Sequence, residues 1–78
     1  MAVTVKITKR GHPISGVRVY FKKLGWAGSI GDKCTGNDGC AHFQYTDPGT
    51  VRLVLSGNGI AHTVESYTLK SGINEFIF

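Results

Sequence analysis

The stretch "GVRVYFKK", residues 16 to 23, decides the fold class. Its apolar residues alternate with polar ones, and this period of two is typical of an extended strand with one buried face. The inward set is Val17, Val19 and Phe21, and the outward set is Arg18, Tyr20 and Lys22. We therefore expect a β-strand here whose apolar side chains help to build the core.

The same alternation recurs on both sides of this strand. Upstream, "AVTVKIT" (residues 2–8) alternates in the same way and is followed by the turn "KRGHPIS" (9–15). Further strands are expected downstream, separated by turns rich in Gly, Pro, Asn and Asp: "TVRLVLSG" (50–57), "IAHTVESYTL" (60–69) and "NEFIF" (74–78). No window shows the three-and-four spacing of a helix. The pattern predicts an all-β fold, an antiparallel seven-stranded β-sandwich.

The stretch "KCTGNDGCAHF", residues 33 to 43, predicts a hairpin. Its "GNDG" segment contains residue types that tolerate positive φ, so Cys34 and Cys40 would lie on the two strands that flank a tight turn. On the second strand, Ala41, Phe43 and Tyr45 would be inward, opposite Cys40, His42 and Gln44. The expected core of the whole chain consists of Val5, Ile7, Val17, Val19, Phe21, Phe43, Leu53, Leu55 and Phe76.

Length and charge limit the number of domains and the kinds of partner that can be expected. With 78 residues, the chain is expected to form one domain, residues 1–78. Its net charge of +4 is spread along the chain, without the basic stripe and interleaved aromatics of a nucleic-acid site. No apolar run reaches the roughly 20 residues of a membrane span, so membrane insertion is not expected. No cofactor is expected. The sequence does not indicate the cellular compartment, which would be extracellular if the chain is a module of a secreted protein.

Cys34, Cys40 and His42 raise three alternatives. As a directly opposed cross-strand pair, the two cysteines would be close enough for a disulfide in an oxidising compartment. With His42 they supply three metal ligands, but their spacing differs from that of a zinc site and nothing brings a fourth ligand near. A redox dithiol would need a tighter Cys-x-x-Cys at a helix N-terminus. The disulfide therefore ranks first.

Catalysis is not expected from these residues. Hydrolysis needs a nucleophile, a base and an orienting group that converge on one site. Cys40 and His42 point the same way along one strand, with their Cα atoms about 7 Å apart, which is too far for a hydrogen bond without a long reach of both side chains. We therefore expect no enzyme.

A binding surface is the remaining candidate. Aromatic and basic side chains gather in and after the strand at 16–23, and the loop "LGWAGSIGD" (24–32) adds a tryptophan near its tip. Such a patch can anchor a protein or a carbohydrate partner. Alternatively, the tryptophan folds back as a lid over the core. The candidate surface consists of Arg18, Tyr20, Lys22, Lys23 and Trp26.

Three separated pieces resemble carboxypeptidase regulatory-like domains, a family with a transthyretin-like (prealbumin-like) sandwich. They are "GHPISGVRVYF" (11–21), like the opening of the family's second strand, "CTGNDGCAHF" (34–43), like its Thr-Asp-x-x-Gly-x-aromatic hairpin, and "DPGTVRLVLSGNGI" (47–60), like its Pro-Gly-x-Tyr-x-Leu strand. Gly36 departs from the usual Asp, and Val51 from the frequent Tyr. We expect a transthyretin-like or an immunoglobulin-like topology.

The resemblance implies a non-catalytic accessory or adhesive module. The leading hypothesis is therefore a binding or structural module whose partner is a protein or a carbohydrate. The second is self-association or docking through a sheet edge, because "INEFIF" (73–78) is apolar and open edges invite pairing. The third is a small metal or redox protein built on Cys34, Cys40 and His42. The oligomeric state separates the first two hypotheses, and thiol and zinc assays test the third.

Overall fold

A computed structural model describes residues 2–23, 31–44 and 50–78. Within these ranges the chain is all-β, with strands and turns and no helix. The strands are β1 (Ala2–Lys9), β2 (His12–Pro13), β3 (Arg18–Lys23), β4 (Gly31–Cys34), β5 (Cys40–Gln44), β6 (Thr50–Gly57), β7 (Ile60–Thr68) and β8 (Gly72–Ile77). Tyr45, Trp26 and the predicted turn at 47–49 lie outside the described residues. Gly31 and Asp32, which we predicted to end a loop, belong to β4.

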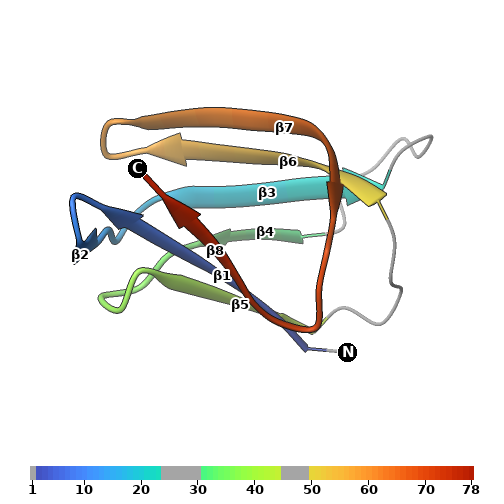
Figure 1. Cartoon of the computed structure of the whole chain (residues 1–78), viewed down its shortest axis with the longest axis horizontal. Helices are drawn as coiled ribbons and strands as arrows, with labels where there is room; N and C mark the ends of the chain where they lie inside the picture. The colour runs from blue at the N-terminus through green and yellow to red at the C-terminus, as the bar shows by residue number, and fades with distance from the viewer. Residues whose placement is uncertain (1, 24–30, 45–49) are drawn as a thin grey trace.

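The strands form two sheets that face each other across one hydrophobic core (Figure 1). The β1 sheet has β1 in its middle, with β5 and β8 along its two sides and the short β2 at its end. The β3 sheet has the order β4-β3-β6-β7. This arrangement is compatible with a β-sandwich.

The strands differ from the predicted seven-stranded antiparallel set in two ways. β8 runs parallel to β1, with Val3 opposite Gly72 and Thr8 opposite Ile77. The additional strand is β2, which lies in the segment predicted to be a turn. Alternation did not predict either feature, because a period of two shows which side chains face inward but not the direction or the partner of a strand.

The core contains nearly all the residues that the alternation predicted. Val5, Ile7, Val17, Val19, Phe21, Phe43, Leu53 and Leu55 are buried. Phe76 is the exception, because it is only partly buried and packs against the margin of the cluster. The core also includes Val3, Ala41, Val51, Ile60 and Leu69.

A bulge in β7 changes the phase of its alternation. Val51 pairs with Tyr67 and Leu53 pairs with Val64, so two residues of β7 lie opposite Arg52. Val64 and Tyr67 are three residues apart, yet both pack against the core. Strict alternation over residues 60–69 would place only one of these side chains inward. The bulge turns the other one toward the core as well.

The predicted hairpin about "GNDG" is wrong beyond its tip. The turn itself forms, because Gly39 donates its amide to the carbonyl of Gly36 at 2.9 Å and adopts a φ of 75°. However, β4 pairs with β3 while β5 pairs with β1, so the two strands belong to different sheets. The buried hydroxyl of Thr35 accepts a hydrogen bond from the amide of Val17 at 3.0 Å and holds the chain beside β3 before it crosses.

The strand order is not that of an immunoglobulin domain. In that fold the first, second, fourth and fifth strands share one sheet, and the third, sixth and seventh share the other. If the two-residue β2 is left out, the first strand here shares its sheet with the fourth and seventh, which are β5 and β8. The immunoglobulin-like alternative is therefore set aside.

Candidate functional site

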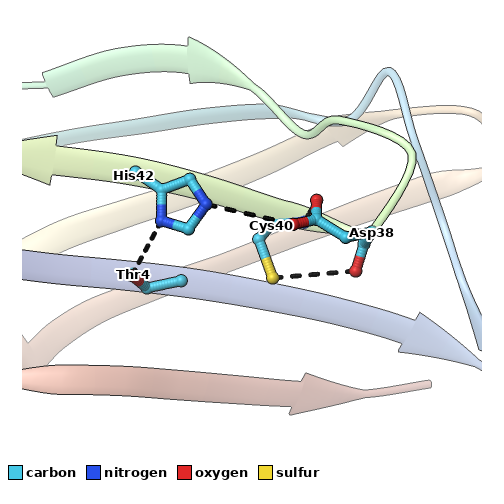
Figure 2. A network of polar contacts seen from close by, with 4 residues as sticks. All are labelled: Thr4, Asp38, Cys40 and His42. Carbon is cyan, nitrogen blue, oxygen red and sulfur yellow. Dashed lines mark hydrogen bonds and ion pairs between the residues drawn. The ribbon is translucent and has the colours of Figure 1, made fainter.

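The outer face of the β1 sheet presents rows of side chains that run across three strands. β5, β1 and β8 lie in register, so outward residues of each strand are direct neighbours. Two rows carry the groups that the sequence singled out: His42, Thr4 and Ile73 in one, and Cys40, Lys6 and Glu75 in the next. Figure 2 shows His42, Cys40 and Thr4 on one face of the sheet, with β8 as the strand beyond β1.

A polar network links β5 to β1 on this face (Figure 2). Nδ1 of His42 lies 3.0 Å from Oγ1 of Thr4, and Nε2 of His42 lies 3.9 Å from Oδ2 of Asp38. The amide of Cys40 donates to Oδ1 of Asp38 at 3.0 Å, and its thiol donates to the Asp38 carbonyl at 3.6 Å. Asp38, in the turn, thus contacts both Cys40 and His42.

The network does not activate the thiol. Cys40 bonds to Asp38, whereas the ring of His42 is directed to Thr4 and to the Asp38 carboxylate. Burial, followed by the negative charge of Asp38, raises the pKa of the Cys40 thiol, and the nearby Lys6 only partly opposes this. A nucleophilic cysteine needs the opposite shift, so this geometry suits a structural thiol.

Cys40 is expected to alkylate more slowly in the folded chain than in the urea-unfolded chain at about pH 8, because only the thiolate reacts. The folded state holds this proton to a higher pH, so the thiol's contribution to stability falls as pH rises above the unfolded pKa. Iodoacetamide labelling followed by peptide mass spectrometry from about pH 7 to pH 10 measures the shift. Equal labelling rates in both states would contradict the assigned environment.

The disulfide and metal alternatives gain no support from the geometry. Cys34 lies opposite Arg18 in the β3 sheet and Cys40 lies opposite Lys6 in the β1 sheet, so the two cysteines are not a cross-strand pair. Both are free thiols. Among the described residues, no three His, Cys, Asp or Glu side chains are grouped so that they could hold a metal ion, including those around His42.

The predicted basic and aromatic surface is divided by the structure. Arg18 and Tyr20 share the outer face of β3, but the Arg18 guanidinium forms two hydrogen bonds with Asp32, at 2.8 and 2.6 Å. These bonds lower the pKa of the Asp32 carboxyl, and the carboxylate balances the positive charge of the guanidinium. Lys22 lies on the same outer face, whereas Lys23 pairs with the inward Val51 and so lies on the other face. Trp26 lies outside the described residues.

Among the described residues β8 pairs only with β1, so its other side is a free edge of the β1 sheet, and this edge presents an apolar surface. In the described part of the chain, the exposed large apolar residues are Ile73, Ile77 and Phe78, at 64%, 73% and 38% exposure. Ile73 and Ile77 flank the exposed Glu75 on the outer face of the sheet, and Oε2 of Glu75 lies 3.8 Å from Nζ of Lys6. The edge thus carries a carboxylate between two isoleucines.

The backbone N–H and C=O groups of β8 point alternately toward β1 and toward the free edge. Phe78 donates its amide to the carbonyl of Thr8 at 2.8 Å, and its own carbonyl accepts from Arg10 at 2.9 Å. Because backbone groups along a strand point alternately to its two sides, those of Phe76 and Asn74 also point toward β1. Those of the alternate residues, Ile73, Glu75 and Ile77, point to the free edge.

A buried asparagine anchors this strand. Asn74 is 2% exposed, and its Oδ1 accepts hydrogen bonds from the Tyr67 hydroxyl at 2.9 Å and the Lys70 amide at 3.0 Å. Its Nδ2 donates to the carbonyls of Lys70, Gly72 and Thr4 at 3.0 to 3.3 Å. Burial raises the pKa of the Tyr67 phenol. Asn74 was not among the predicted site residues, although its position two residues before Phe76 indicates an inward side chain.

Among the described residues, β8 is less protected than the other sheet edges, because its one charged residue, Glu75, lies between two exposed isoleucines. Natural edge strands are guarded by charged side chains, bulges or short length. β4 is short and exposes Lys33, β5 is short and exposes His42, and β7 carries a bulge beside Glu65. β8 is regular over its whole length and exposes Ile73 and Ile77. It is therefore the edge best suited to pair with another strand.

Comparison with known proteins assigns the chain to no family, since neither a protein-family model nor a curated protein matches it. The described residues contain no helix long and apolar enough to cross a membrane. Within these residues, the β8 edge is the surface whose geometry points most directly to an interaction.

Proposed function

We propose that the chain is a non-catalytic interaction module that binds a protein partner by strand pairing along the free edge of β8. The exposure of Ile73 and Ile77 on a regular edge strand carries this proposal. An extended segment of the partner extends the β1 sheet beyond β8 and bonds to the backbone of the edge residues. Its side chains cover the two isoleucines.

A protein partner is favoured over a carbohydrate. Sugar sites present aromatic faces, whereas the β8 edge presents backbone hydrogen-bonding groups and aliphatic side chains. Glu75 between the two isoleucines adds a carboxylate, and its pairing with Lys6 at 3.8 Å lowers the cost of covering it with a partner strand. The aromatic and basic patch that could have suited a sugar is divided between two faces, and its arginine is already paired with Asp32.

The finer class that we propose is the transthyretin-like sandwich of carboxypeptidase regulatory-like domains. Two glycines of the resembling motifs support it, because Gly16 and Gly39 both have positive φ. A Cβ at Gly16 would lie 2.8 Å from the side chain of Asn58, and one at Gly39 would lie 2.6 Å from the carbonyl of Ile7. These motif positions therefore have a physical reason to be glycine in this fold.

A peptide titration tests the proposed function. The probe is a short peptide that alternates isoleucine and threonine about a central lysine, added to the ¹⁵N-labelled full chain. We expect saturable amide shifts in residues 72–77, and their loss in Ile77→Lys. Thr63→Lys, on the exposed edge strand β7, serves as the matched control and is expected to bind as the unaltered chain does. Shifts confined to other strands, or no shifts in a chain that is also monomeric, would refute the proposal.

A further inference from the structure

We infer that the strand that pairs with β8 is the β8 of a second copy of the chain, antiparallel to the first about a twofold axis at Glu75. This inference rests on the proposed function and names its partner. The two β1 sheets then join into one continuous sheet in the order β5-β1-β8-β8-β1-β5. A twofold contact of this kind uses the same surface on both copies and closes without free ends.

The sequence of β8 is symmetric about Glu75 in the residues that matter. Ile73 and Ile77 lie two residues before and two residues after it, and all three side chains are on the outer face. In the antiparallel register that opposes the two Glu75 residues, each Ile73 faces the second copy's Ile77. Paired aliphatic side chains in directly opposed positions stabilise a sheet. The backbone N–H and C=O groups of these three residues, which point to the edge, then hydrogen-bond to the same groups of the second copy.

The same register suits the inner face. There, Phe78 is placed opposite the second copy's Gly72, where no side chain obstructs the ring and where a Cβ would have no atom within 4 Å. Phe78 is 38% exposed in the single chain, and its ring packs against His62 of β7 at 5.4 Å between centroids. A second copy therefore covers an aromatic side chain that is only partly covered by its own chain.

The charges of Lys6 and Glu75, in the row that crosses the twofold axis, affect the strength of the contact. The order across the axis is Lys6, Glu75, then the second copy's Glu75 and Lys6, so each carboxylate has a lysine on its far side at 3.8 Å. Two like charges that directly face each other oppose pairing, and the lysines reduce this opposition. Glu75→Gln is therefore expected to raise the association constant by up to about fivefold. Lys6→Gln is expected to lower it.

Sedimentation equilibrium of the full chain, from about 10 μM to 1 mM, tests for the dimer. We expect a reversible monomer–dimer equilibrium that is lost in Ile73→Lys and Ile77→Lys and retained in Thr63→Lys. Both isoleucines are exposed, so these variants should keep the melting behaviour of the unaltered chain. A monomer at every concentration, or a dimer that Ile77→Lys leaves intact, would overturn the inference.

Cysteine cross-linking tests the register, in a chain that also carries Cys34→Ser and Cys40→Ser. Opposed residues of a hydrogen-bonded pair have Cα atoms about 5.5 Å apart, a distance that a disulfide spans. We expect Glu75→Cys to cross-link with itself under mild oxidation, and Ile73→Cys to cross-link with Ile77→Cys but not with itself. Self-cross-linking of Ile73→Cys as rapid as that of Glu75→Cys would refute the register.

The two proposals can fail separately. If the lysine-centred peptide shifts residues 72–77 while the chain stays monomeric, the second copy is not the partner and the proposed function stands. If neither the peptide nor a second copy engages β8, both proposals fall.

Discussion

Phe21→Ala is expected to lower the free energy of unfolding by about 3–5 kcal/mol, the cost of deleting a fully buried phenyl ring. The side chain is 0% exposed, and its ring meets that of Phe43 edge to face at 4.8 Å between centroids. β4 passes so close that a Cβ at Gly31 would lie 2.6 Å from the ring, so this strand loses its support. A chain of 78 residues has a total stability of about 4–12 kcal/mol, so the variant loses much of it.

Urea denaturation followed by circular dichroism measures this loss, and the neighbouring Tyr20→Ala is the control. Tyr20 is also aromatic and also on β3, but it lies on the outer face, where the guanidinium of Arg18 is 5.3 Å from its ring centroid. Its replacement is expected to cost only about 1 kcal/mol. Equal losses in the two variants would contradict the assignment of inner and outer faces.

Asn74→Ala is expected to cost about 3 kcal/mol, because it removes a buried amide and takes a hydrogen-bond partner from several part-buried polar groups. The Lys70 amide and the Tyr67 hydroxyl lose an acceptor, and the carbonyl of Thr4 in β1 loses a donor. β8 is then less firmly held to β1 and to the turn before it. We expect the dimer through β8 to weaken together with the fold.

Two further variants give this prediction its controls. Ile73→Ala changes an exposed residue next to Asn74 and is expected to stay within about 0.5 kcal/mol of the unaltered chain. Asn74→Asp keeps the shape of the side chain but places a carboxylate against the carbonyls that Nδ2 contacts. Burial should raise the pKa of that carboxyl, so its deficit in stability should shrink as pH falls. An Asn74→Asp chain that is fully stable at neutral pH would contradict the hydrogen-bond assignment.

Alternation along the sequence was sufficient to predict strands and faces, because it reports which side chains avoid water. It placed Val19 and Phe21 inward and His42 outward, and the structure confirms all three. It was insufficient to predict strand partners, which depend on contacts between distant segments. The "GNDG" turn is an example: its local chemistry is that of a hairpin, yet Thr35 holds the preceding strand beside β3 and the next strand pairs with β1.

The residues of the candidate site could be predicted only in part from the sequence. The apolar character of residues 73–78 indicated an interacting edge, and the phase of Phe76 implied that Ile73 and Ile77 face outward. The parallel pairing with β1, which leaves the other side of β8 open, had no sequence signal. Asn74 was predictable as an inward residue and a turn was expected between residues 69 and 74, but turn composition does not specify which side chain hydrogen-bonds to the turn backbone.

Amide hydrogen exchange along β8 tests the central claim most directly. In dilute solution, we predict fast exchange at Ile73, Glu75 and Ile77, whose amides point to the free edge, and slow exchange at Asn74 and Phe76, whose amides point to β1. At a concentration where the chain pairs, the three edge amides become protected and the other two do not change. Edge amides that are already protected in the dilute chain would contradict the free edge, and edge amides that stay exposed at every concentration would contradict the pairing of two copies through β8.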